Sequence, residues 1–87
     1  MENIKEISQI IKNIESQANI VDFFKELLTK SELETLSKRW HILKMLKKGI
    51  PQRQIAKELQ VSLCKITRGA KILKDNNSIL AKHLIKE

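Results

Sequence analysis

A chain of 87 residues with a net charge of +7 and a single cysteine, Cys64, forms one small domain at most and has no internal disulfide. Cys64, His41 and His83 are too widely spaced for a zinc site of the usual kind. The sequence also has no paired acid and base, activated nucleophile or phosphate-binding loop, so we expect neither a metal nor an enzyme. No apolar run reaches the roughly 18 residues that a membrane span needs, and the N-terminus has no signal-peptide core, so we expect a cytoplasmic protein without membrane contact.

The positive charge lies almost wholly in the C-terminal part of the chain. Residues 1–35 carry four lysines against seven acids, a net −3, whereas residues 36–87 carry ten lysines and three arginines against three acids, a net +10. A surface of this kind attracts a polyanion, so nucleic acid is the expected partner. The alternatives are a basic surface that is merely solvated and a lipid surface. The second is disfavoured because Trp40 is the only aromatic residue of the basic part.

Helical spacing of apolar residues predicts an all-α chain that begins with two strongly apolar helices. The first is expected over about residues 3–17 and the second over residues 21–28. Together they carry more apolar surface than so short a monomer can bury, which favours a homodimer. The alternative is that they cover the third helix of their own chain. The isoleucines that indicate the first helix are Ile4, Ile7, Ile11 and Ile14.

A third, long helix is expected to begin at a capping box, in which two residues three positions apart cap each other's backbone N–H groups. The pair is either Thr29 with Glu32 or Ser31 with Glu34. Basic residues followed by a glycine predict that this helix ends near residues 47–49.

Residues 52–73 have the pattern of a helix-turn-helix, in which two short helices pack at a steep angle. Ala56 provides the small residue where the helices cross, and Ser62 is the expected N-cap of the second helix. The turn usually has a glycine with left-handed backbone, and Gln60 stands there at a cost of about 1 kcal/mol. The apolar positions of the motif are occupied by Ile55, Leu59, Val61 and Ile66.

Asn76 or Asn77 is the expected cap of a last helix, which carries apolar residues at Ile79, Leu80 and Leu84. We therefore predict a single domain with dimerisation helices over residues 1–50, the helix-turn-helix over 51–74 and a C-terminal dimerisation helix over 75–87.

The chain also contains Leu28-Thr29 before the long helix, Arg39 within it, Gln52-Arg53, and Ile66-Thr67-Arg68-Gly69 followed by Leu73-Lys74. With these pieces, residues 27–75 resemble the tryptophan repressor family. The resemblance implies an intertwined homodimer of six-helix chains, each with one helix-turn-helix. It also implies a transcriptional repressor that binds a double-stranded DNA operator and uses free L-tryptophan as its corepressor, with no other cofactor.

The resemblance places the indole of L-tryptophan between Arg39 of the long helix and Arg68 of the second helix of the motif. Arg68 would also hold the carboxylate, and Thr29 would lie beside that carboxylate. Gly69 would let the ring approach the backbone. Without the resemblance, Arg39 reads as an exposed helix arginine and Arg68 as a phosphate contact.

The ligand's ammonium would be bound by the backbone carbonyls of Glu26 and Leu28. The family often has a serine hydroxyl near this group, and Ile72 stands at that position here. Ile72 offers no acceptor, which raises the alternative of a DNA-binding regulator of the same fold that works without tryptophan. A further alternative is a helix-turn-helix that binds only protein.

The expected DNA contacts divide into those that position the protein and those that read bases. Gln52 and Arg53 at the start of the motif, and Thr67 and Lys74 in its second helix, are expected at backbone phosphates. The first residues of the second helix, Leu63, Cys64 and Lys65, are expected to face base edges. Ala56, Cys64 and Lys65 depart from residues common in the family, so the operator is expected to differ. Cys64 is interpreted as an incidental small residue, with a redox switch as the alternative.

Overall fold

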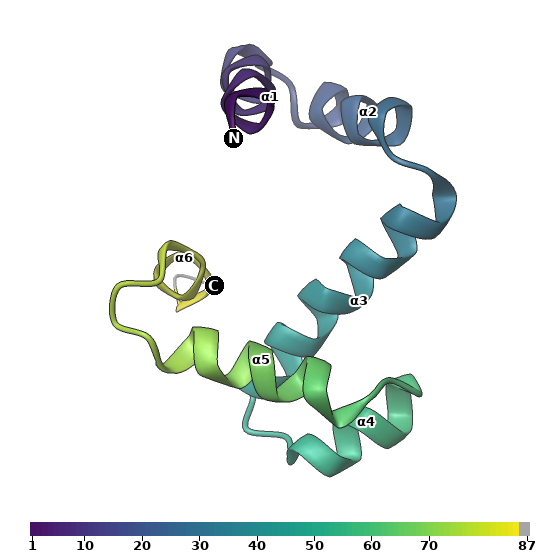
Figure 1. Ribbon diagram of the computed structural model, residues 1–87, viewed down its shortest axis with the longest axis vertical. Helices are drawn as coiled ribbons and strands as arrows, with labels where there is room; N and C mark the ends of the chain where they lie inside the picture. The colour runs from purple at the N-terminus through teal and green to yellow at the C-terminus, as the bar shows by residue number, and fades with distance from the viewer. Residues whose placement is uncertain (86–87) are drawn as a thin grey trace. The chain divides into compact units, whose positions relative to one another are not determined.

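The computed structural model describes residues 1–85, which form six helices and no strand (Figure 1). The all-α prediction is confirmed. The chain forms two compact units, one up to Glu34 and one from Thr35 onwards. None of the described helices is long and apolar enough to cross a membrane. The helices are α1 (Glu2–Asn13), α2 (Gln17–Leu27), α3 (Lys30–Lys47), α4 (Gln52–Leu59), α5 (Leu63–Lys74) and α6 (Ile79–Ile85).

The boundary between α1 and α2 differs from the prediction, because α1 ends four residues earlier than expected and α2 begins four residues earlier. Ile14 is already in extended backbone after α1. Ser16 is also extended, and its hydroxyl accepts a hydrogen bond from the N–H of Asn19 at 3.4 Å. A serine that caps the next helix ends the preceding one, even though the isoleucine periodicity continues to Ile14.

The first unit buries little apolar surface. No residue of α1 or α2 is buried, and Ile4 and Ile10 remain 57% and 52% exposed. The only ring contact of α2 joins neighbouring residues, Phe23 and Phe24, edge to face at 6.1 Å. The apolar excess that the sequence indicates is therefore not covered within this unit.

The start of α3 has the capping box predicted at Thr29 and Glu32. The Thr29 N–H donates to Glu32 Oε1 at 2.8 Å, and the Glu32 N–H donates to Thr29 Oγ1 at 3.1 Å. The backbone hydrogen bond from Thr29 lowers the pKa of Glu32 below its ordinary value, so this contribution to stability is lost only as the pH falls through that lowered pKa. The alternative box is wrong, because Ser31 lies inside the helix.

The helix α3 ends at Lys47, as predicted, and the turn that follows contains a glycine with left-handed backbone. Gly49 has a φ of +86°, and its N–H donates to the carbonyl of Leu46 at 3.0 Å. The N–H of Ile50 donates to the carbonyl of Met45 at 3.2 Å. This pair of bonds satisfies carbonyls that the last turn of a helix leaves without partners.

The last helix is capped by Ser78, and the prediction of Asn76 or Asn77 is wrong. The Ser78 hydroxyl accepts from the N–H of Ala81 at 3.0 Å. The Asn77 N–H instead donates to the carboxylate of Asp75 at 2.9 Å, which closes a turn before the helix. Residues 86–87, the end of the predicted C-terminal dimerisation segment, lie outside the described residues.

Candidate nucleic-acid interface and ligand site

The α4–α5 pair is joined by a turn of the predicted kind. Gln60 has left-handed backbone with φ 54° and ψ 46°, and the N–H of Val61 donates to the carbonyl of Ala56 at 3.2 Å. Ser62 occupies the N-cap of α5 in extended backbone, but its side chain accepts no capping hydrogen bond, in contrast to the expectation for a serine there.

The core beneath this turn consists of the apolar residues that define the motif. Ile55 of α4 and Ile66 of α5 are both fully buried. They pack with Ile42 and Met45 of α3, and the half-buried Ala56, Leu59 and Val61 surround them. Burial of these side chains holds α4 and α5 in one geometry on α3, because close-packed cores admit few alternatives.

Gly69 lies where α5 meets α3. A Cβ at this position would be 3.2 Å from Leu46 Cδ1 and 3.4 Å from Leu43 Cδ2. A glycine therefore lets the two helices approach closely. The resemblance assigns Gly69 to the ligand, whereas the contact present here is with α3.

The outer surface of the helix-turn-helix is strongly positive. Within residues 52–74 there are six cations and one acid, Glu58, and this carboxylate accepts a hydrogen bond from Gln54 Nε2 at 3.0 Å. No acidic residue lies in the first turn of α4 or α5. The surface can therefore receive a polyanion without like-charge repulsion. The six cations, all exposed, are Arg53, Lys57, Lys65, Arg68, Lys71 and Lys74.

The predicted base-reading residues, Leu63, Cys64 and Lys65, form the first turn of α5, and all three are exposed. Side chains there are free to reach the edges of bases if the helix enters a groove.

The predicted phosphate contacts lie on α4 and α5, and two of them contact each other. The Thr67 hydroxyl donates to the carbonyl of Leu63 at 3.0 Å and lies 3.4 Å from Gln52 Oε1. A hydroxyl has one hydrogen, so Thr67 donates either to Leu63 within α5 or to Gln52, and only the bond to Gln52 joins the start of α4 to α5. The Gln52 amide N–H groups, Arg53 and the exposed Lys74 at the end of α5 remain as donors to phosphate.

The predicted ligand residues of the second unit lie on two helices that meet. Arg39 is four residues before Leu43 and seven before Leu46, so it belongs to the α3 face that contacts Gly69. Arg68 adjoins Gly69, and both arginines are exposed. Ile72, one turn after Arg68, is half-buried. Thr29, in the other unit, is exposed, and both its backbone N–H and its hydroxyl oxygen are engaged by Glu32 in the capping box.

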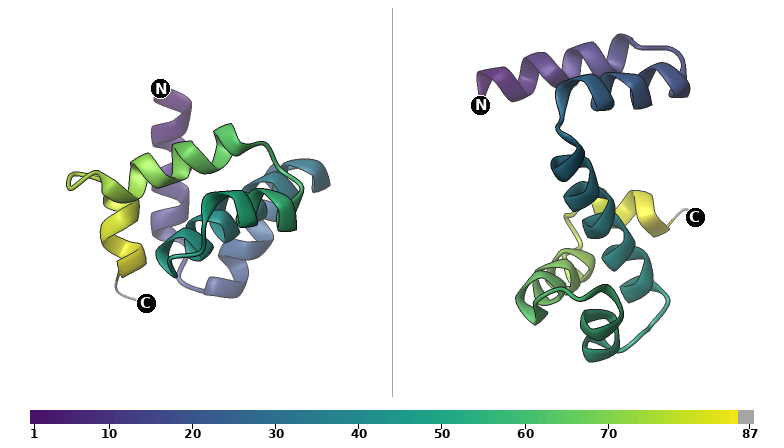
Figure 2. Two further views of the ribbon diagram at one scale, coloured as in Figure 1. Left: turned by 90° about the horizontal axis from the view of Figure 1, so that it is seen from below. Right: turned by 90° about the vertical axis from the view of Figure 1, so that its right-hand side faces the viewer.

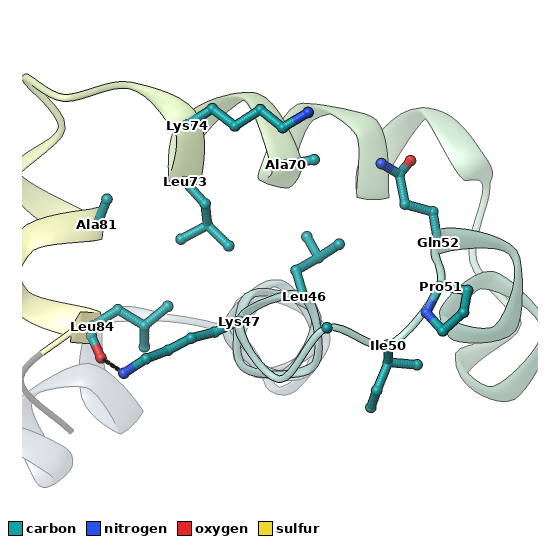
Figure 3. A pocket seen from close by; sticks show the side chains of 11 residues that line it. Leu46, Lys47, Ile50, Pro51, Gln52, Ala70, Leu73, Lys74, Ala81 and Leu84 are labelled. Carbon is teal, nitrogen blue, oxygen red and sulfur yellow. Dashed lines mark hydrogen bonds between the residues drawn. The ribbon is translucent and has the colours of Figure 1, made fainter.

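A pocket of about 450 Å³ lies among the end of α3, the turn that follows it, α5 and α6 (Figure 3). Figure 3 shows Leu46 and Leu73 pointing into it. None of the five predicted ligand residues lines this pocket, whereas two of the predicted phosphate contacts, Gln52 and Lys74, do. The other lining residues are Lys47, Gly49, Ile50, Pro51, Ala70, Ala81 and Leu84.

Lys47 has a role that the sequence did not indicate. Its ammonium donates to the carbonyl of Leu84, which joins α3 to α6 (Figure 3). The helix α5 contacts both α4 and α6, which lie towards its two ends in the left view of Figure 2. Nothing in the local sequence around Lys47 distinguishes it from the other lysines of this part, because its partner is 37 residues away.

Within residues 1–85 no group of three or more His, Cys, Asp or Glu side chains could hold a metal ion.

The fold defines a helix-turn-helix protein, and its exposed cations form the kind of surface that is typical of DNA-binding members of this class. The family model described as "Trp repressor protein" matches residues 2–87, and the chain belongs to this family, whose members are non-enzymatic regulators. The resemblance seen in the sequence is thereby confirmed.

Similar proteins include a "Trp operon repressor homolog" of Xylella fastidiosa (strain 9a5c), 48% identical over 52 residues. That match covers 59% of this chain and 56% of the relative, so the chain spans little more than half of this relative. A "Trp operon repressor homolog" of Chlamydia trachomatis serovar D is 32% identical over 79 residues, which is 90% of this chain and 84% of the relative. No solved structure matches the chain.

Proposed function

We propose that this chain is a sequence-specific transcriptional repressor that binds its operator as a homodimer, with L-tryptophan as corepressor. The observation that carries the DNA-binding part is the charge on the surface of α4 and α5, where the helix-turn-helix has six exposed cations and one acid. Phosphate neutralisation supplies much of the affinity of such surfaces for DNA. A helix-turn-helix that binds only protein would need no such concentration of positive charge.

The homodimer is supported by apolar surface that one chain leaves uncovered. Ile4, Ile10 and Val21 of the first unit are 44–57% exposed, and no residue of α1 or α2 is buried. In the second unit, Trp40 is 40% exposed and the α3–α5–α6 pocket is lined mainly by apolar residues. A second copy of the chain would remove this surface from water.

The assembly is tested by light scattering at micromolar concentration. We expect a mass about twice the 10.1 kDa of one chain. The variant Ile4→Glu should shift the protein towards smaller or unfolded species, because it places a charge in the shared core. The neighbouring Lys5→Glu, a charge change on an exposed residue, is the control. A folded species of single-chain mass would contradict the homodimer.

The tryptophan part is supported by the positions of Arg39 and Arg68 on two helices that meet at Gly69. Two guanidinium groups can flank an aromatic ring, and one of them can bind a carboxylate through paired hydrogen bonds. Because Arg68 belongs to α5, a ligand held by Arg68 would bias the orientation of the helix that enters the groove. A ligand acts in this way only if it binds the DNA-competent orientation more tightly.

Calorimetric titration of the purified protein with L-tryptophan tests this site. We expect binding that strengthens operator affinity. Arg68→Ala should lower the affinity for L-tryptophan about tenfold or more, because a hydrogen bond to a charged group contributes about 1.5–3 kcal/mol. Lys71→Ala, which removes a cation three residues further along α5, should leave tryptophan affinity unchanged. Ile72→Ser should strengthen binding if a hydroxyl acceptor is what the site lacks.

The competing function is a regulator of the same fold that needs no tryptophan, and the observation in its favour is the half-buried, apolar Ile72. It would be established if millimolar L-tryptophan gives no heat and leaves operator affinity unchanged.

A further inference from the structure

Leu63, the first residue of α5, is an apolar side chain on an otherwise cationic surface. It is 46% exposed, whereas the isoleucines of the motif core, Ile55 and Ile66, are fully buried. Within α4 and α5 it is the one large apolar side chain so exposed. It lies in the turn that the helix-turn-helix presents to DNA, so its exposure calls for a partner with an apolar group there.

We propose that the first turn of α5 reads two different base pairs directly, a thymine through the contact of Leu63 with its 5-methyl group and a guanine through Lys65. The proposal rests on the sequence-specific DNA binding proposed above. In the major groove the thymine methyl is the apolar group of the base pairs, and the O6 and N7 of guanine are the acceptors that lysine recognises.

The two side chains lie on opposite flanks of α5. Thr67 lies one turn after Leu63 and beside Gln52, which places Leu63 on the flank of α5 nearer the start of α4. Lys65 follows Leu63 by two residues, which is about 200° of rotation around the helix axis. With Cys64 between them, one base cannot receive both side chains.

The width of the helix sets the spacing of the two bases. Side chains on opposite flanks are separated by about 10 Å, the diameter of a helix with its side chains, and base pairs are stacked about 3.4 Å apart. We therefore place the thymine and the guanine about two to three base pairs apart in each half-site, with the thymine nearer the phosphates that Gln52 and Arg53 contact.

The experiment begins with selection of preferred duplexes from a random library by the full-length protein in the presence of millimolar L-tryptophan. Each thymine of the selected operator is then replaced by deoxyuridine, which removes only the methyl group. Each guanine is replaced by 7-deazaguanine, which removes only the N7 acceptor. Affinities are measured for the wild type, Leu63→Ala and Lys65→Ala, with Lys57→Ala as the control that removes an exposed cation of α4 outside this turn.

At one thymine position per half-site, deoxyuridine should weaken wild-type binding about fourfold, the effect of one buried methyl group. The same replacement should have no effect on Leu63→Ala. At one guanine position two to three base pairs away, 7-deazaguanine should weaken the wild type about tenfold and leave Lys65→Ala unaffected. Lys57→Ala should retain both sensitivities.

Two results would overturn the proposal while leaving the repressor function intact. One is an operator whose thymines all tolerate deoxyuridine, and the other is a Leu63→Ala or Lys65→Ala variant that keeps the full sensitivity of the wild type. If the selection enriches no sequence at all, the proposed function fails and this reading fails with it.

Discussion

Affinity for duplex DNA is expected to fall about a hundredfold when the salt concentration rises from about 50 to about 200 mM. In the proposed dimer, Arg53 and Lys74 of both chains would make about four cationic phosphate contacts, and each would contribute about −0.9 to the slope of log affinity against log salt. The other exposed cations of the motif can only steepen this slope. The measurement is a gel shift or anisotropy titration at several salt concentrations.

The same experiment separates positioning from reading. Lys74→Ala should weaken binding similarly for all sequences and reduce the slope by about one for each chain. Lys82→Ala, which removes an exposed cation of α6 outside the motif, serves as the matched control and should keep the wild-type slope. Binding that does not change with salt would contradict a phosphate interface and favour a protein partner.

Replacement of Ile55 by alanine is expected to lower the free energy of unfolding by about 2–5 kcal/mol. The Ile55 side chain is completely buried, with 0% of its surface exposed, and it packs with Ile42, Met45 and Ile66. For a domain of this length the loss corresponds to a melting temperature lower by roughly 10–30 °C. Thermal unfolding followed by circular dichroism at one fixed protein concentration measures it, because the stability of a dimer depends on concentration.

Leu63→Ala is the control for that prediction, because it removes the same kind of side chain from the exposed first turn of α5. Its free energy of unfolding should stay within about 0.5 kcal/mol of the wild type, while its operator preference changes. If Ile55→Ala melted at the wild-type temperature, the packing of α4 on α3 would not be what holds the motif together.

Local signals predicted most of the helices. The capping box at Thr29, the glycine turn at Gly49 and the left-handed Gln60 all involve residues within a few positions of one another, so their geometry follows from neighbouring residues. The errors at the starts of α2 and α6 were also local. Ser16 and Ser78 are ordinary capping residues, but the isoleucine periodicity continues past Ser16 and the asparagines precede Ser78, and both features favour other helix boundaries.

The amino-acid sequence by itself determined the helical class, the helix-turn-helix with its buried Ile55 and Ile66, and the concentration of cations on that motif, since each depends on periodicity, turn chemistry or composition. Only the tertiary structure decided that Gly69 meets Leu43 and Leu46, and that Lys47 joins α3 to α6. It likewise decided which residues line the α3–α5–α6 pocket. These features join residues far apart in the chain, and their geometry depends on how the helices cross, which side-chain packing sets and no local pattern specifies.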